Sequence, residues 1–134
     1  MIKRRTLALL PAALNVLDRF HIAKKLGEAV DEVRRQEAKQ LAADGYEPVL
    51  KNSRYCFLKR RSNLTIRQAT KLRDLLKYDL KSIRALALKE SFDAFWQYDS
   101  PRWAGWFLKK WCTRTMRSKL APMKKFVGTL RNHE

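Results

Sequence analysis

Asp18 and His21 are the residues whose types and spacing could serve phosphoryl-transfer chemistry. Asp18 directly follows residues 14–17, which are apolar except for Asn15 and would suit a short buried strand, and His21 comes three residues later. Nucleases place carboxylates at strand ends, where they hold divalent ions against the attacking and leaving oxygens of a phosphate. Aspartate is also a favoured helix N-cap, and spacing alone favours that interpretation. A lone histidine near a helix start is likewise more often a packing residue than a contact to phosphate or metal-bound water.

Basic residues form the second candidate group. The chain has 134 residues, with 30 Lys or Arg against 13 Asp or Glu, and a formal net charge of +17. No acidic residue lies between Asp99 and Glu134. Such an excess repels itself unless anions offset it, so nucleic acid is the leading partner; an anionic membrane surface or a merely solubilising face are the alternatives. The predicted nucleic-acid contacts are Arg60, Arg61, Arg67, Lys71, Lys109, Lys110, Arg114, Arg117, Lys124 and Lys125.

Four aromatic residues, Trp103, Trp106, Phe107 and Trp111, form the third group. Aromatic rings among basic residues can stack on unpaired bases. The spacing of these four is predicted to place them on one helical face, which favours packing in the core over base stacking.

Other signals for chemistry or targeting are weak. The sequence contains no phosphate-cradling glycine loop, HExxH, GxSxG or zinc-like Cys/His set. Cys56 and Cys112 each lie beside aromatic residues and are predicted to be reduced packing residues of a cytoplasmic protein. Residues 1–17 imitate a signal peptide, but Pro11 interrupts the apolar run, so we expect neither secretion nor a membrane partner.

The elements that must position these residues are mainly α-helical, since only four Gly and four Pro punctuate the chain. Apolar residues recur at helical spacing from Arg19 to Leu41, and Gly45 supplies a stop. A short helix is expected within residues 49–61, with a strand as the lesser option.

The second half of the chain is predicted to be helical throughout. Residues 64–96 indicate a helical hairpin whose first helix is capped by Thr65. Ser100 and Pro101 are typical of the start of a further helix, and a last helix follows from residue 121.

Four stretches of the sequence together resemble a known family. In chain order they are "LPAALNVLDRFHIAKKLGEAVDEVRRQE", "SRYCFLKRRSNLTIRQATKLRDLL", "LALKESFDAFW" and "APMKKFVGTLRNH". They resemble bacterial insertion-sequence transposases of the DDE type, and most closely the group often called ISL-three. The resemblance covers nearly the whole chain from Leu10 onward, and "DRFH" with the following "VRRQE" is its most specific element.

This resemblance implies a fold and a division of the chain. Such transposases have an RNase H-like catalytic core that is interrupted by a helical insertion. Residues 1–45 would be a fragment of that core, with one short strand and a long helix. Residues 46–62 would connect it to a basic, all-helical insertion region at 63–134.

By the same resemblance, Asp18 matches the second catalytic, metal-ligating aspartate and His21 matches the histidine that follows it. The implied chemistry is Mg²⁺-dependent cleavage and strand transfer at transposon ends, with water or a 3′-hydroxyl as nucleophile. No acidic residue precedes Asp18 as the first carboxylate, and Glu134 comes too early to be the third. One carboxylate cannot fix two Mg²⁺ ions in a defined geometry, so we expect no catalysis by this chain alone.

The sequence therefore predicts a truncated or partial transposase that is involved in DNA transposition and binds DNA. Its expected partners are transposon ends and either an intact transposase or further copies of itself. Two alternatives remain. One is a non-catalytic helical DNA-binding module that inhibits or assembles with an intact transposase, and the other is a basic helical RNA-binding protein.

Overall fold

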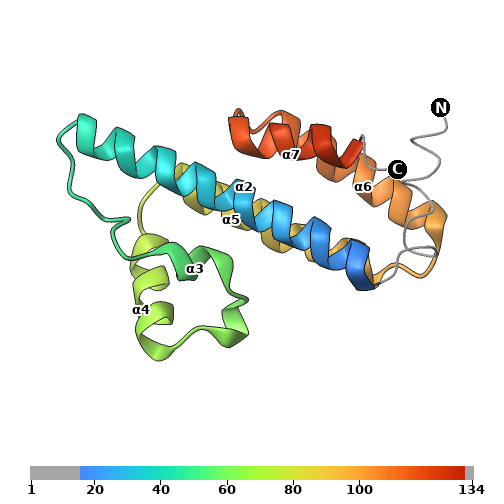
Figure 1. The fold of residues 1–134 in the computed structure, drawn as a ribbon, viewed down its shortest axis with the longest axis horizontal. Coiled ribbons are helices and arrows are strands. Elements are labelled where there is room, and N and C mark those ends of the chain that lie inside the picture. The colour runs from blue at the N-terminus through green and yellow to red at the C-terminus, as the bar shows by residue number, and fades with distance from the viewer. Residues whose placement is uncertain (1–15, 132–134) are drawn as a thin grey trace.

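The computed structural model describes residues 16–131, with side chains from residue 19 onward. This part of the chain contains helices and no strand (Figure 1), which confirms a mainly α protein; an RNase H-like strand core is not seen in it. No helix among these residues is long and apolar enough to cross a membrane. The elements are α2 (Val16–Ala43), α3 (Arg54–Leu58), η1 (Arg61–Asn63), α4 (Ile66–Leu75), α5 (Lys81–Phe92), η2 (Asp93–Gln97), α6 (Pro101–Met116) and α7 (Ala121–Arg131).

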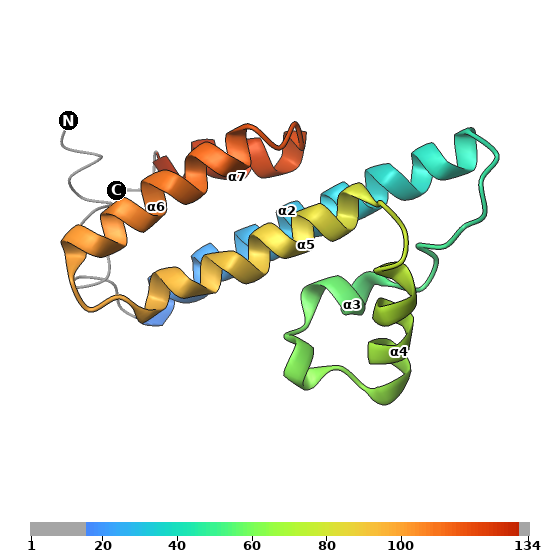
Figure 2. The same cartoon turned by 180° about the vertical axis from the view of Figure 1, so that it is seen from behind.

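Helix α2 is the axis on which the other helices are arranged (Figures 1 and 2). Helices α5 and α7 pack along α2, and α6 packs on α7 and on η2. The short helix α3 packs against both α2 and α4. In both views α3 and α4 lie toward the end of the molecule away from α6, so the two most basic regions of the sequence are separated in space.

The strand predicted for residues 14–17 is wrong where the structure describes it. Val16 and Leu17 already belong to α2, while residues 14 and 15 lie outside the described residues. A short apolar run cannot be told from a buried helix segment by periodicity alone, and here it leads directly into the helix whose buried face includes Ile22. Asp18 therefore lies within a helix, and neither at a strand end nor at an N-cap.

The other predicted helix boundaries are confirmed. Helix α2 ends at Ala43, and Gly45 follows with a left-handed φ of 78° that favours glycine. At the start of α4, Gln68 N donates to Thr65 Oγ1 (3.1 Å) and Thr65 N donates to Gln68 Oε1 (3.0 Å), which is a capping box. Ser100 Oγ accepts a hydrogen bond from the first turn of α6. The preferred short helix within residues 49–61 is α3.

A cluster of aromatic rings at the centre of the core joins α5, α6 and α7. The Phe92 ring lies edge-on to Trp111, with 4.8 Å between the ring centroids, and 6.1 Å from Phe126. Trp111 is 1% exposed, and its indole Nε1 donates to the Leu88 carbonyl oxygen (2.9 Å) and to Ser91 Oγ (3.1 Å). These contacts fix the rotation of α6 about its own axis. They therefore also determine which of its side chains point away from the core.

A carboxylate from α2 caps the N-terminus of α5. Leu80, the N-cap residue of α5, makes no side-chain cap of its own. Instead Glu37 Oε2 accepts from Lys81 N (2.7 Å), while Glu37 Oε1 accepts from Ser82 N (2.8 Å) and Ser82 Oγ (2.6 Å). The negative charge also lies at the positive end of the helix dipole. This contact fixes where α5 begins along α2.

We expect Glu37→Ala to lower the free energy of unfolding by about 1–3 kcal/mol, because it leaves donors in the first turn of α5 without partners. Glu32→Ala is the matched control on the same helix. Glu32 pairs with the exposed Arg35, and its loss should change stability by about 1 kcal/mol or less. Urea unfolding followed by circular dichroism measures both variants, and equal effects would contradict the role of Glu37.

The two cysteines are packing residues, as predicted. Cys56 and Cys112 are both buried and free. Burial raises the pKa of the Cys112 thiol to about 11, and it also raises the pKa of Cys56 above its usual value. Cys56 Sγ donates to the Gln68 carbonyl oxygen (3.4 Å) and so joins α3 to α4. Both thiols are held in the neutral form at pH 7.

Candidate nucleic-acid interface

The candidate interface is the face of α6 that points away from the core. Helix α6 starts at the Ser100 cap with Pro101 in its first turn, and it buries one stripe of side chains against the rest of the bundle. At 3.6 residues per turn the remaining positions fall on the opposite side. The buried stripe is Ala104, Leu108, Trp111, Cys112 and Thr115. The outer face of α6 is formed by Trp103, Trp106, Lys109, Lys110, Thr113, Arg114 and Arg117.

Four cations dominate this outer face. Lys109, Lys110, Arg114 and Arg117 are exposed, and together with Trp106 and Thr113 they line a shallow hollow that contains no carboxylate. Within residues 16–131 none of the four forms an ion pair. Their charges are therefore available to an anion from outside this part of the chain.

Two exposed tryptophans lie beside these cations. Trp103 is 55% exposed and Trp106 is 48% exposed, and their rings meet edge to face with 5.8 Å between centroids. Lys110 Nζ lies 4.5 Å from the centre of the Trp106 ring, within range of a cation–π interaction. Aromatic and basic side chains thus form one continuous stripe.

The prediction that the four aromatics share one buried face is wrong for Trp103 and Trp106. Trp111 alone is fully buried, and Phe107 is half-buried against Tyr98, with 5.6 Å between ring centroids. The buried stripe of α6 starts at Ala104 and continues through residues at helical spacing from it. Trp103 and Trp106 lie outside that stripe. The signal in the sequence was the 3–4 spacing that links Trp103 and Trp106 to the cations further along α6.

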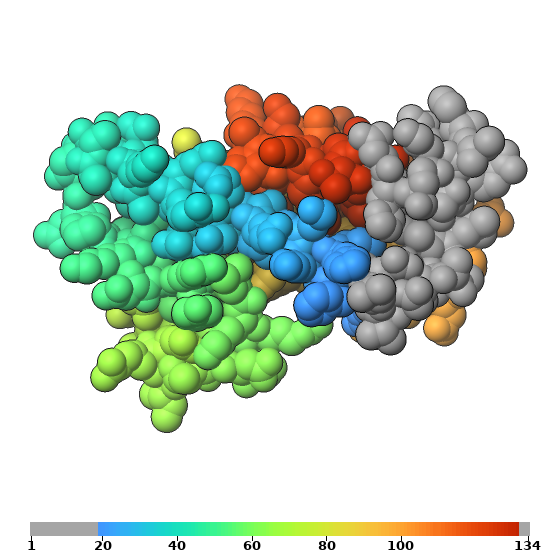
Figure 3. Space-filling model, viewed as in Figure 1, coloured from blue at the N-terminus to red at the C-terminus, as the bar shows by residue number. Residues whose placement is uncertain are grey.

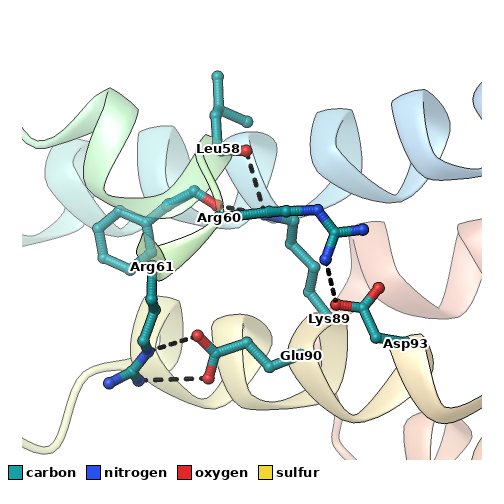
Figure 4. A network of polar contacts seen from close by, with 7 residues as sticks. Leu58, Arg60, Arg61, Lys89, Glu90 and Asp93 are labelled. Atoms are coloured by element: carbon teal, nitrogen blue, oxygen red, sulfur yellow. Dashed lines mark hydrogen bonds and ion pairs between the residues drawn. The ribbon is translucent and has the colours of Figure 1, made fainter. Parts of the chain in front are cut away.

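Arg60 and Arg61 are engaged with carboxylates of the bundle (Figure 4). Arg61 Nη2 lies 3.2 Å from Glu90 Oε1 in a two-bonded pair, and Arg60 Nη1 lies 3.5 Å from Asp93 Oδ2. These pairs hold the η1 segment against α5 and η2. The two arginines were predicted to contact nucleic acid, but their charges are already partly offset.

Lys89 completes this network from the inside. Its Nζ donates to the carbonyl oxygens of Phe57 (2.9 Å) and Leu58 (3.2 Å), where it offsets the negative end of helix α3. Desolvation by burial lowers the pKa of Lys89, while the carboxylates of Asp93 and Glu90 oppose that shift. Lys89 is therefore a structural cation that ties α3 to α5.

The same network borders a groove of about 1430 Å³ between α2, α3, α5 and α7. Figure 3 shows this side of the molecule, on which α2 lies between α7 and the α3–α4 region. Basic and acidic side chains alternate along the α2 wall, where Asp31 pairs with Arg34 and Arg35. The groove is thus less uniformly positive than the outer face of α6.

The remaining predicted contacts are divided between two other helices. Arg67 is exposed and Lys71 half-buried on α4, at the end of the molecule away from α6. Lys124 and Lys125 are exposed on α7, where Lys125 lines the groove. The ten predicted contact residues therefore form no single surface, and the largest unpaired group lies on α6.

Asp18 and His21 are the two residues that the sequence predicts to take part in catalysis. Both lie on α2; His21 is exposed, and its ring centroid is 6.1 Å from that of Phe20. The side chain of Asp18 is outside the described part of the structure. Among the described residues no three His, Cys, Asp or Glu side chains gather so as to hold a metal ion. The described residues alone therefore offer no set of ligands for Mg²⁺, and the metal-ligating role of Asp18 stays a prediction.

Comparison with known proteins gives two matches. A family model described as "Transposase", for the ISL-three group of the DDE type, matches residues 2–134. The chain is 31% identical, over 125 residues, to the "Transposase for insertion sequence element IS1001" of Bordetella parapertussis. The match covers 92% of this chain and 31% of that relative, so the chain spans less than a third of the relative's length. No solved structure shows a significant match.

Proposed function

The chain belongs to the ISL-three group of DDE-type insertion-sequence transposases, and we propose that it takes part in DNA transposition by binding DNA on the outer face of α6. The observation that carries this proposal is the row of Lys109, Lys110, Arg114 and Arg117, exposed together with no carboxylate in the hollow that they line. The relative is described as a transposase for an insertion sequence. A polyanionic DNA end is the partner that suits such a row.

The geometry of the row fits a phosphate backbone. From Lys109 to Arg117 the helix axis rises about 12 Å, at about 1.5 Å per residue. Phosphates follow one another every ~3.4 Å along a strand of B-DNA, so several lie within reach of the four side chains. Each phosphate that a cation neutralises releases condensed counterions, which makes binding favourable and strongly dependent on salt.

We assign Asp18 as the second catalytic aspartate of the family and the only carboxylate of that set in this chain. His21 would follow it one helical turn later. A defined two-metal site needs several carboxylates held rigidly, and the described residues offer no such group. We propose accordingly that residues 16–131 bind DNA ends and do not by themselves cut them.

The proposal is tested by competition between DNA sequences. Three labelled probes of equal length are compared over a salt series: the end of the insertion sequence, a shuffled duplex and a structured RNA. We expect the end duplex to bind tightest, with the logarithm of the binding constant falling linearly with the logarithm of salt concentration. Equal affinity for both duplexes would contradict recognition of ends, and preference for RNA would favour an RNA-binding protein.

A further inference from the structure

We propose that the Trp103–Trp106 end of the outer face of α6 binds unpaired DNA bases, which stack on the two exposed rings while the adjoining phosphates lie on the cations. This rests on the proposed DNA-binding function and adds to it a preference for single-stranded segments. It follows from three features of α6: exposed rings, a continuous helical stripe and the absence of negative charge.

The rings are exposed where a packed core would have buried them. Burying a tryptophan contributes far more to stability than leaving it in water, and Trp103 and Trp106 nevertheless lie half-exposed beside each other. Each ring keeps about half of its surface exposed, and any base can stack on an exposed aromatic ring. Bases in a duplex already stack on one another, so only unpaired bases can take that place.

The rings and the cations lie on one stripe of α6. Trp103, Trp106, Lys110, Arg114 and Arg117 follow one another at spacings of three or four residues, which keeps them on one side of the helix. Over these residues the axis rises about 21 Å, enough for several nucleotides of a single strand. A single strand that lies along the stripe would stack its bases on the rings at one end and place its phosphates on the cations at the other end.

The charge around the rings selects an anionic partner. Lys110 Nζ lies over the Trp106 ring, 4.5 Å from its centre, so a cation already covers one face of this ring and leaves the other to a base. Residues 100–133 contain no Asp or Glu. An apolar protein partner would have to leave four cations without counter-charge at the edge of its interface, whereas single-stranded DNA satisfies rings and cations together.

The test compares one oligonucleotide as a single strand and as a blunt duplex, bound by the full chain at a fixed salt concentration. The double variant Trp103→Ala/Trp106→Ala should weaken single-strand binding by about tenfold or more, and duplex binding by about twofold or less. The variant Trp103→Phe/Trp106→Phe keeps aromatic faces and should recover most of the loss. Both positions are exposed, so circular dichroism should show unchanged folding.

Several outcomes would overturn this inference while leaving the proposed function intact. One is unchanged single-strand binding by the alanine variant, and another is an equal loss on both substrates. Without DNA, the alanine variant and the wild-type chain should sediment with the same mass. A difference in mass would show instead that the rings form a protein interface. If the alanine variant lost binding to anionic phosphatidylserine vesicles but kept its binding to DNA, the rings would form a membrane contact. Failure of the proposed function is distinct, because the wild-type chain would then bind neither substrate.

Discussion

Replacing Lys109, Lys110, Arg114 and Arg117 together by glutamine should weaken binding to duplex DNA by roughly 10²- to 10³-fold at 0.1 M salt. These four cations lie exposed on the outer face of α6 and form no ion pair within the described residues. Each phosphate contact contributes about −0.9 to the slope of log K against log salt. Loss of four contacts should therefore make the slope shallower by about 3 to 4. Fluorescence anisotropy over a salt series measures both quantities.

A matched control removes the same charge from elsewhere. Lys39, Lys51, Lys77 and Lys81 are exposed and lie outside α6 and α7. Their replacement by glutamine lowers the net charge equally, but it should change the slope by about 1 or less. If both quadruple variants lose affinity equally, binding follows net charge alone and the α6 surface has no special role.

The largest expected effect on stability is that of Trp111→Ala, which should lower the free energy of unfolding by about 3–5 kcal/mol. The ring is fully buried between Phe92 and Phe126. Its removal leaves a cavity where three helices meet, and it takes away the indole donor to Ser91 Oγ and the Leu88 carbonyl. Because small domains are stable by only about 5–15 kcal/mol, this variant should be close to unfolding at 37 °C.

Trp106→Ala is the control for Trp111→Ala, since it removes the same side chain from the same helix five residues earlier. Trp106 is 48% exposed and contacts Lys110 through its ring. Its loss should cost about 1 kcal/mol or less. Chemical denaturation of both variants measures the difference, and similar losses would contradict the division of α6 into a buried and an outer face.

The helix boundaries were predictable from the sequence because their signals are local. Thr65 and Gln68 stand at the spacing of a capping box, and Gly45 follows the last turn of α2. The cap on α5 was not predictable. It comes from Glu37, more than forty residues earlier, and only the packing of α5 on α2 brings the carboxylate to it.

The buried face of α6 was only partly predictable. Trp111 was predicted correctly to lie in the core, but the spacing of the four aromatic residues assigned Trp103 and Trp106 to the core as well. Small residues such as Ala104 and Thr115 define the buried stripe, since α7 and η2 pack closely on that side. The spacing of the aromatic residues alone does not indicate which side of a helix is buried; the pattern of all residues along the helix does.

The environment of Asp18 was the least predictable feature. An apolar run followed by aspartate is compatible with a strand end, with an N-cap and with the first turns of a helix, and only tertiary contacts decide among them. The structure shows α2 extending through Val16 and Asp18. The assignment of Asp18 as a catalytic residue rests on the resemblance to transposases and stays a prediction.

The most direct test of the central claim, that the outer face of α6 contacts DNA, is site-specific photo-crosslinking. A benzophenone side chain replaces Thr113, which is exposed in the α6 hollow, or Thr70, which is exposed on α4 at the far end of the molecule. With a duplex carrying the insertion-sequence end, crosslinks should form from position 113 and not from position 70. Crosslinks from position 70 with none from position 113 would contradict the account.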